Sequence, residues 1–403
     1  MWNYRSKYDI IIHIGGEALD NLDDDYMIDV AKEHKYQNQS REYCEAFLKW
    51  RTNKKNPYGY KFVHDKREHT YIDGEGYVEK KPAQAEKKSL LKCCFLLGIT
   101  MIFMLAVDLG KMLVIKYYFK LSGGANVYYS ELNDYKPLSS EIVYFAAVCN
   151  MLKYIVPIAV FKFVSRIPAK VMLPTARGSF RLGASGVLLM LVVTAIGRIG
   201  NYFLAYLMGL ANIDSVYYDY IYTDNRTAML FFFIGQFIIT PILMEILFRG
   251  LILQTFRQFG DLFAILITSV INCLCYYDIA QIGYIFCASV VVGLFTIRTG
   301  SIYTAFAMRI SGRVLTFVMT YISFHLGYIE GKIFETIVCL AIFAGSIIVY
   351  SRLISKGEWN FNIRNDDSHM TLGEKIKTSV TSTVLASWIL VSVVLTVFCI
   401  KFL

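Results

Sequence analysis

The chain has 403 residues, of which 55% are hydrophobic, and its formal net charge at pH 7 is +9. This apolar fraction is well above that of an ordinary soluble domain, so the composition excludes a water-soluble globular protein. No basic domain accounts for the positive charge, which favours basic loops beside a membrane and argues against nucleic-acid binding. We therefore expect an integral membrane protein whose first partner is the lipid bilayer.

Residues 1–88 are the longest polar stretch, and we expect them to form a small cytoplasmic region that mixes helix and strand. The patterns predict a strand over 8–14, helices over 24–35 and 41–51, and a hairpin over 59–78. The first 20 residues do not show a basic flank followed by an uncharged apolar core, so no cleavable signal peptide is expected.

Nine apolar segments follow, each close to the roughly 20 residues that cross a hydrocarbon core of about 30 Å. They are residues 90–115, 138–161, 182–210, 227–256, 262–277, 280–297, 301–325, 333–351 and 381–402. The predicted fold is thus an all-α polytopic membrane protein of about eight to nine helices. We divide it into a bundle over 89–352, a cytoplasmic loop over 353–380 and an extra C-terminal helix over 381–403.

The charges of the loops predict the orientation of these helices. Lys80, Lys81, Lys87 and Lys88 precede the first span and place the N-terminus in the cytoplasm. The basic loop 162–181 falls on the same side, whereas the acidic, tyrosine-rich loops 121–137 and 211–225 fall outside. We expect the plasma membrane as the location.

The chain offers little for a metal or a cofactor, and we expect neither. Four of its six histidines lie in residues 1–88, and the nine cysteines have no metal-binding spacing. An intramembrane metal site built from two or three histidines is excluded by composition.

Two charges interrupt the apolar run 227–256. Glu245 and Arg249 lie four residues apart, so on a helix they share one face, with the acid N-terminal to the base. A charge at the bilayer centre costs about 2.5–3.5 kcal/mol, so both side chains are expected to face the protein interior and to pair.

The surrounding motif, Pro-x-x-x-Glu-x-x-Phe-Arg-Gly, resembles the first motif of the CAAX-protease and bacteriocin-processing (CPBP, Abi) family of intramembrane endopeptidases. A second block, Arg298-Thr299-Gly300-Ser301, resembles the Arg-Thr-Gly-Ser turn before the family's last catalytic helix. The resemblance extends over 227–324 and implies a CAAX-protease-type bundle. It also implies peptide cleavage within the membrane, in which a glutamate and a histidine activate water and a further histidine and asparagine hold the oxyanion.

This sequence departs from the family's pattern at most of the reacting positions. Met244 takes the place of the first glutamate of Glu-Glu-x-x-x-Arg, while Glu245 and Arg249 are retained. The histidine of the second motif falls on Tyr276 or Tyr277, with a register uncertain by one residue. Arg309 and Arg313 occupy the histidine and asparagine positions of the third motif. The chain therefore resembles a degenerate member, because these replacements cannot do the same proton chemistry.

The first functional hypothesis is a catalytically inactive relative that binds a membrane partner, a peptide or a lipid in the former active-site cavity. Arg309 and Arg313 lie on one helical face and repel each other, so they need anionic partners. An arginine fork suits a lipid phosphate or a peptide carboxylate. The alternative for these two arginines is structural, either pairing with nearby acids or reaching a water-facing end.

The second hypothesis is an active CAAX-type endopeptidase with a divergent site based on Glu245, helped by Tyr276 or Tyr277. Its substrate would be a membrane peptide or a prenylated protein. The two hypotheses differ in the state of Glu245. A peptidase needs this carboxylate free enough to take a proton from water, whereas a binding protein needs it held by arginine.

Overall fold

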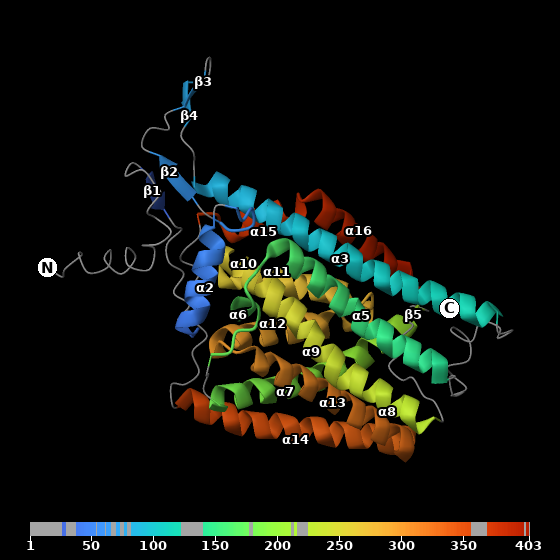
Figure 1. The fold of residues 1–403 in the computed structure, drawn as a ribbon. Helices are drawn as coiled ribbons and strands as arrows, with labels where there is room; N and C mark the ends of the chain where they lie inside the picture. Colours follow the sequence, from blue (N-terminus) through green and yellow to red (C-terminus); the bar gives the residue numbers. More distant parts are fainter. Residues whose placement is uncertain are drawn as a thin grey trace.

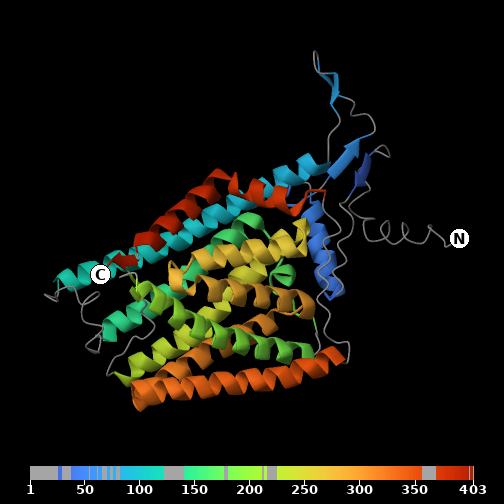
Figure 2. The same ribbon diagram turned by 180° about the vertical axis from the view of Figure 1, so that it is seen from behind.

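The computed structural model describes residues 26–29, 38–53, 55–60, 62–65, 70–72, 76–78, 82–121, 140–176, 180–210, 213–215, 225–355, 369–398 and 400–402. Most of these residues form a bundle of long helices that run side by side (Figure 1). One face of the bundle consists of α3 (Pro82–Leu121), α5 (Ser140–Ser165) and α16 (Thr383–Phe398). The opposite face consists of α7 (Phe180–Leu210), α13 (Ile302–Leu326) and α14 (Tyr328–Ser355), as Figure 2 also shows.

Between the two faces lies the segment Arg226–Phe259, which we call the motif helix because it carries the first motif. Its hydrogen-bonding pattern changes several times along α8 (Arg226–Ile234), η2 (Gly235–Ile239), α9 (Thr240–Glu245), η3 (Ile246–Ile252), α10 (Leu253–Phe256) and η4 (Arg257–Phe259). The segments η2 and η3 are π-helical. Short π segments inside α-helices are frequent at functional sites, so this helix is the first place to look for one.

Two shorter elements and a turn complete the central layer. They are α11 (Asp261–Leu274), η5 (Ile279–Gln281) and α12 (Ile282–Thr299). The turn between α12 and α13 requires glycine, because Gly300 has a φ of +64° and an added Cβ would lie 2.0 Å from the Asn38 carbonyl oxygen. The segment after α6 (Ala169–Met172) holds this turn, since Ala176 N donates to Gly300 O and Ile302 N donates to Pro174 O.

Among the described residues, six helices are long and apolar enough to cross a membrane, and a seventh is obtained if one bent pair counts as a single span. That pair joins α15 (Leu372–Val380) to α16 at an angle of 79°. The expected span 262–277 is replaced by α11, whose 14 residues rise only about 21 Å. The expected span 301–325 forms α13, which is 25 residues long. It contains Arg309 and Arg313 and is not among the six apolar helices.

The N-terminal part joins the bundle through α2 (Arg41–Thr52), close to the helix predicted over 41–51. Ser40 caps this helix by accepting a hydrogen bond from Tyr43 N. Tyr43, Phe47 and Trp50 are buried in the same core as the motif helix, and α2 lies across one end of the bundle (Figure 1). The indole Nε1 of Trp50 donates to Ser165 O over 2.8 Å and so fixes α2 to the end of α5.

Short antiparallel strand pairs account for the remaining described elements. They are β1 (Tyr26–Asp29) with β2 (Phe62–Asp65), β3 (Thr70–Ile72) with β4 (Gly76–Val78), and β5 (Ile213–Ser215) with β6 (Ile400–Phe402). The helix predicted over 24–35 is wrong at 26–29, where β1 pairs with β2 instead. The strand predicted over 8–14 lies outside the described residues.

Candidate functional site

The carboxylate of Glu245 is completely buried between two arginine side chains. Its Oε1 accepts a hydrogen bond from Nε of Arg309 over 2.7 Å, and its Oε2 lies 3.4 Å from Nε of Arg249. Glu245 ends α9, Arg249 belongs to the π-helical η3, and Arg309 comes from α13 on the opposite side. Two buried guanidinium groups therefore share a single carboxylate.

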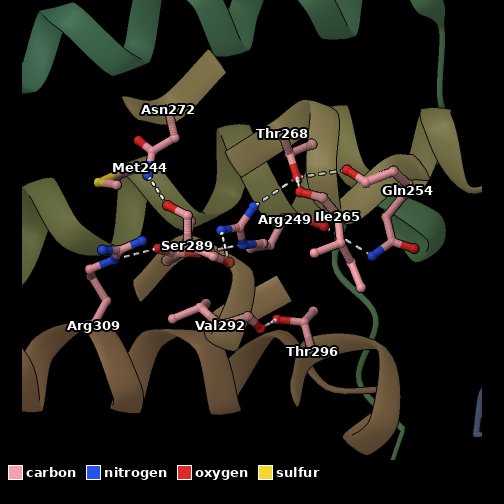
Figure 3. Close-up of polar contacts among 12 residues, drawn as sticks. Met244, Arg249, Gln254, Ile265, Thr268, Asn272, Ser289, Val292, Thr296 and Arg309 are labelled. Atoms are coloured by element: carbon pink, nitrogen blue, oxygen red, sulfur yellow. Dashed lines mark hydrogen bonds and ion pairs between the residues drawn. The ribbon is translucent and has the colours of Figure 1, made fainter. Parts of the chain in front are cut away.

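Arg249 has further partners that draw its guanidinium away from Glu245. Its Nη1 donates to Thr268 Oγ1 over 3.0 Å and its Nη2 donates to Ser289 O over 2.6 Å, so it links α11 and α12 to the motif helix (Figure 3). The side chain of Gln254 donates to Arg249 O over 2.9 Å. These contacts hold Arg249 as a structural brace between three elements.

Three of the substituted motif positions, Met244, Tyr276 and Arg313, are linked by hydrogen bonds. The Tyr276 hydroxyl donates to Met244 Sδ over 3.6 Å and accepts from Arg313 Nη2 over 2.9 Å. Tyr277 does not join them: it has a φ of +55° and its ring lies under Nζ of Lys153, 5.8 Å from the ring centroid. Of the two candidates for the histidine position, Tyr276 is therefore the one beside Met244 and Arg313.

The hydrogen bonds within this cluster are incomplete. Among the described residues, Glu245 Oε2, Arg249 Nε and Arg309 Nη2 are buried without a hydrogen-bond partner. The first two face each other at 3.4 Å, so they still attract as an ion pair. Nη2 of Arg309 keeps an unused donor on a charged group, and a buried polar atom of this kind is costly unless something accepts from it.

Three residues of the site had no role in the sequence-based hypotheses: Thr268, Asn272 and Ser289. Nδ2 of Asn272 donates to Ser289 Oγ, next to the Ser289 carbonyl that binds Arg249. Thr268, Asn272 and Tyr276 are spaced by four residues along α11 and its end, so they lie on one face. That spacing of polar residues in an apolar run is the signal that could have identified them. Ser289 has no comparable signal.

The geometry restricts what the cluster can do chemically. A general base must offer a lone pair to a water molecule. Arg309 occupies one acceptor position on Oε1 of Glu245 and Arg249 lies 3.4 Å from Oε2, so a water would have to share this buried carboxylate with two cations. Tyr276 and Met244 stand beside it in place of a second proton acceptor. In the described part of the chain, no three His, Cys, Asp or Glu side chains are grouped so that they could hold a metal ion. The arrangement favours holding charges in place over transferring protons.

These features define the class of protein: an all-α polytopic membrane protein with an ion-paired polar site inside its helix bundle. Residues 226–315 match the family model described as type II CAAX prenyl endopeptidase Rce1-like. The match includes the motif helix, Arg309 and Arg313, and it confirms the resemblance to the CAAX-protease family that the two motifs indicate. Residues 226–315 are thus a CAAX-protease-like segment of a membrane protein. Comparisons with curated proteins and with solved structures found no match.

Proposed function

We propose that this protein is a catalytically inactive relative of the CAAX proteases that binds an anionic group of a membrane partner. The single observation that carries the proposal is the contact between Arg309 Nε and Glu245 Oε1 at 2.7 Å. It puts a permanent cation on the carboxylate that a divergent peptidase would need as its base. An arginine stays protonated in proteins, so it neither accepts a proton nor releases one to a leaving group.

The chemistry of the bound group follows from the charges. Arg249 and Arg309 are both fully or almost fully buried, and they share the one carboxylate of Glu245. Nη2 of Arg309 retains an unused donor, and Arg313 lies one helical turn further along the same face of α13. A lipid phosphate or a peptide carboxylate provides the oxygen acceptors that such guanidinium groups bind best.

The experiment compares Arg313→Gln with Arg226→Gln after purification in mild detergent, with the bound lipids and peptides identified by mass spectrometry. Arg313 is the better target because it is half-buried, whereas removing Arg309 would leave Glu245 poorly paired. Arg226 is an exposed arginine at the start of α8 and controls for the loss of one charge. We expect the anionic ligand to be depleted at least several-fold in Arg313→Gln alone. Equal ligand content in the wild type and both variants would contradict the proposal.

The second candidate is an active CAAX-type endopeptidase based on Glu245. The observation in its favour is the family match, which spans the retained Glu245 and Arg249. It requires Glu245 to separate from Arg309 before it can act on water, so the two candidates make opposite predictions for cleavage.

A further inference from the structure

A second group of charged side chains lies away from the motif residues, between α3 and α5. Asp108 and Lys111 are one turn apart on α3, and Lys153 comes from α5. The Asp108 carboxylate binds Lys153 Nζ at 2.6 Å and lies 3.8 Å from Lys111 Nζ. The cluster therefore contains two positive charges and one negative charge.

The two lysines differ in how fully their donors are used. Lys153 also donates to Cys275 O over 3.3 Å, and its Nζ lies over the ring of Tyr277, so its ammonium group has several partners. Lys111 has only one hydrogen bond to a described residue, to Oδ1 of Asn150 over 3.0 Å, besides the long contact with Asp108. An ammonium group has three donors, so Lys111 can still bind another acceptor.

Lys111 is the first member of a short chain of hydrogen bonds that continues through Asn150 to Gln236. Nδ2 of Asn150 donates to Oε1 of Gln236 over 3.1 Å, which connects α5 with the π-helical η2 of the motif helix. That bond uses the oxygen of the Gln236 amide and leaves its NH₂ group to donate elsewhere. Lys111 and Gln236 therefore present N–H groups at the two ends of one short polar chain.

The position of Lys111 indicates where its missing acceptor comes from. On the face of α3 that carries Lys111, Asp108 is buried, whereas Val114, one turn further along, is 50% exposed. On a helix of the bundle's outer face, such a surface faces lipid. The side chain of Lys111 is itself 22% exposed, so the ammonium group reaches the edge of this surface. A cation at that place is stabilised when it meets a lipid headgroup.

We propose that Lys111, supported by Asn150 and Gln236, forms a binding site for a phosphate group, with the headgroup of an anionic phospholipid as its source. The phosphate balances the second positive charge of the cluster and accepts from the free donors of Lys111. The site is separate from Arg309 and Arg313, and it stands whether or not those arginines bind an anion.

The test is native mass spectrometry of the full chain in detergent, titrated with short-chain phosphatidylglycerol, with neutral diacylglycerol as the control lipid. We expect Lys111→Gln to weaken retention of the phospholipid by about tenfold, as for the loss of one charge-assisted hydrogen bond. Lys111→Arg should restore it. Lys92→Gln, at an exposed position of the same helix, should behave as the wild type.

A purely structural role for the cluster predicts a different pattern. Asp108→Asn removes the carboxylate that competes with the phosphate, so the proposal predicts tighter phospholipid binding in this variant. If the cluster is only a structural ion pair, Lys111→Gln and Asp108→Asn would both destabilise the protein, and neither would change phospholipid retention. That result would overturn the proposal. Competition with inorganic phosphate identifies the source: displacement at millimolar concentration shows that the phosphate group alone suffices, and resistance shows that the acyl chains contribute.

Discussion

At the scale of single residues, the site is governed by how many cations surround Glu245. Removing one partner of a buried ion pair costs about 3–5 kcal/mol because the other charge is left uncompensated, whereas replacing both is far less harmful. Arg309 provides the shorter of the two contacts with Glu245, at 2.7 Å against 3.4 Å for Arg249. We therefore regard Arg309 as the principal counter-ion of Glu245.

This assignment predicts the outcome of a double-mutant cycle. Arg309→Met should destabilise the protein by roughly 3–5 kcal/mol, because Glu245 then keeps only its looser contact with Arg249. In the background of Glu245→Gln the same substitution should cost much less, since no buried carboxylate is left behind. Thermal unfolding in detergent measures both effects. If the two substitutions were simply additive, the ion pair would have no energetic role.

The sequence predicted only part of this arrangement. The spacing of Glu245 and Arg249 predicts a buried pair, and the two charged groups do lie 3.4 Å apart. It does not predict that Arg249 belongs to the π-helical η3 or that its guanidinium also binds Thr268 and Ser289. A change of helix type leaves no mark in the hydrophobic pattern. The sequence also could not decide between Tyr276 and Tyr277. Helical spacing does not apply to these two residues, because α11 ends at Leu274 and the backbone of Tyr277 has a positive φ.

At the scale of elements, α2 contacts the motif helix through a hydrogen bond between side chains. The Tyr43 hydroxyl donates to Gln254 Oε1 over 2.6 Å, and Gln254 in turn donates to Arg249 O. Burial raises the pKa of Tyr43 to about 12, so this hydroxyl keeps its proton at physiological pH. The N-terminal helix is thereby linked to the arginine of the first motif through a single glutamine.

The turn between α12 and α13 predicts a contrast between two glycines. Gly300→Ala should destabilise the protein by roughly 1–3 kcal/mol, because its φ is +64° and the new Cβ would collide with Asn38 O. Gly209→Ala, inside α7 with no neighbouring atom within 4 Å of an added Cβ, should be neutral or slightly stabilising. Thermal unfolding of the two variants checks this. Equal stability of both would show that Asn38 does not press on the turn.

The sequence predicted an element correctly where the local pattern is strong. It failed where the structure of a segment depends on pairing with a distant segment. The helix over 41–51 follows from its cap and its apolar face, and α2 matches it closely. The pairing of β1 with β2 joins residues about 35 positions apart, and local propensity does not contain it. The span expected over 262–277 was too long because the apolar run continues beyond Leu274, where the helix stops.

At the scale of the whole molecule, the segments 38–53 and 55–60 pack into the bundle's core through their aromatic side chains. Tyr60 N donates to Gln258 Oε1 over 2.7 Å, and the side chain of Gln258 donates to Tyr58 O over 2.9 Å. Tyr43, Phe47, Trp50 and Tyr60 are all almost completely buried. The CAAX-protease-like segment is thus covered at one end by a segment of the same chain from outside the family match.

The charges of the loops predict on which side this covered end lies. A cysteine introduced at Ser355, at the end of α14, should react with a membrane-impermeant maleimide only after permeabilisation, because that end is expected in the cytoplasm. A cysteine at Arg226, at the start of α8, should react in intact cells. Labelling above the background of the native cysteines is the readout. The reverse pattern would invert the proposed orientation.

The central claim, that Glu245 is held by arginine and does no hydrolysis, is tested most directly by a cleavage assay. The purified protein in lipid nanodiscs is incubated with a mixed library of prenylated and unprenylated peptides, beside Glu245→Gln, and the products are identified by mass spectrometry. We predict no cleavage by either protein, because the Glu245 carboxylate is bound to Arg309. Cleavage by the wild type that disappears in Glu245→Gln would contradict this account and establish a peptidase with a single carboxylate.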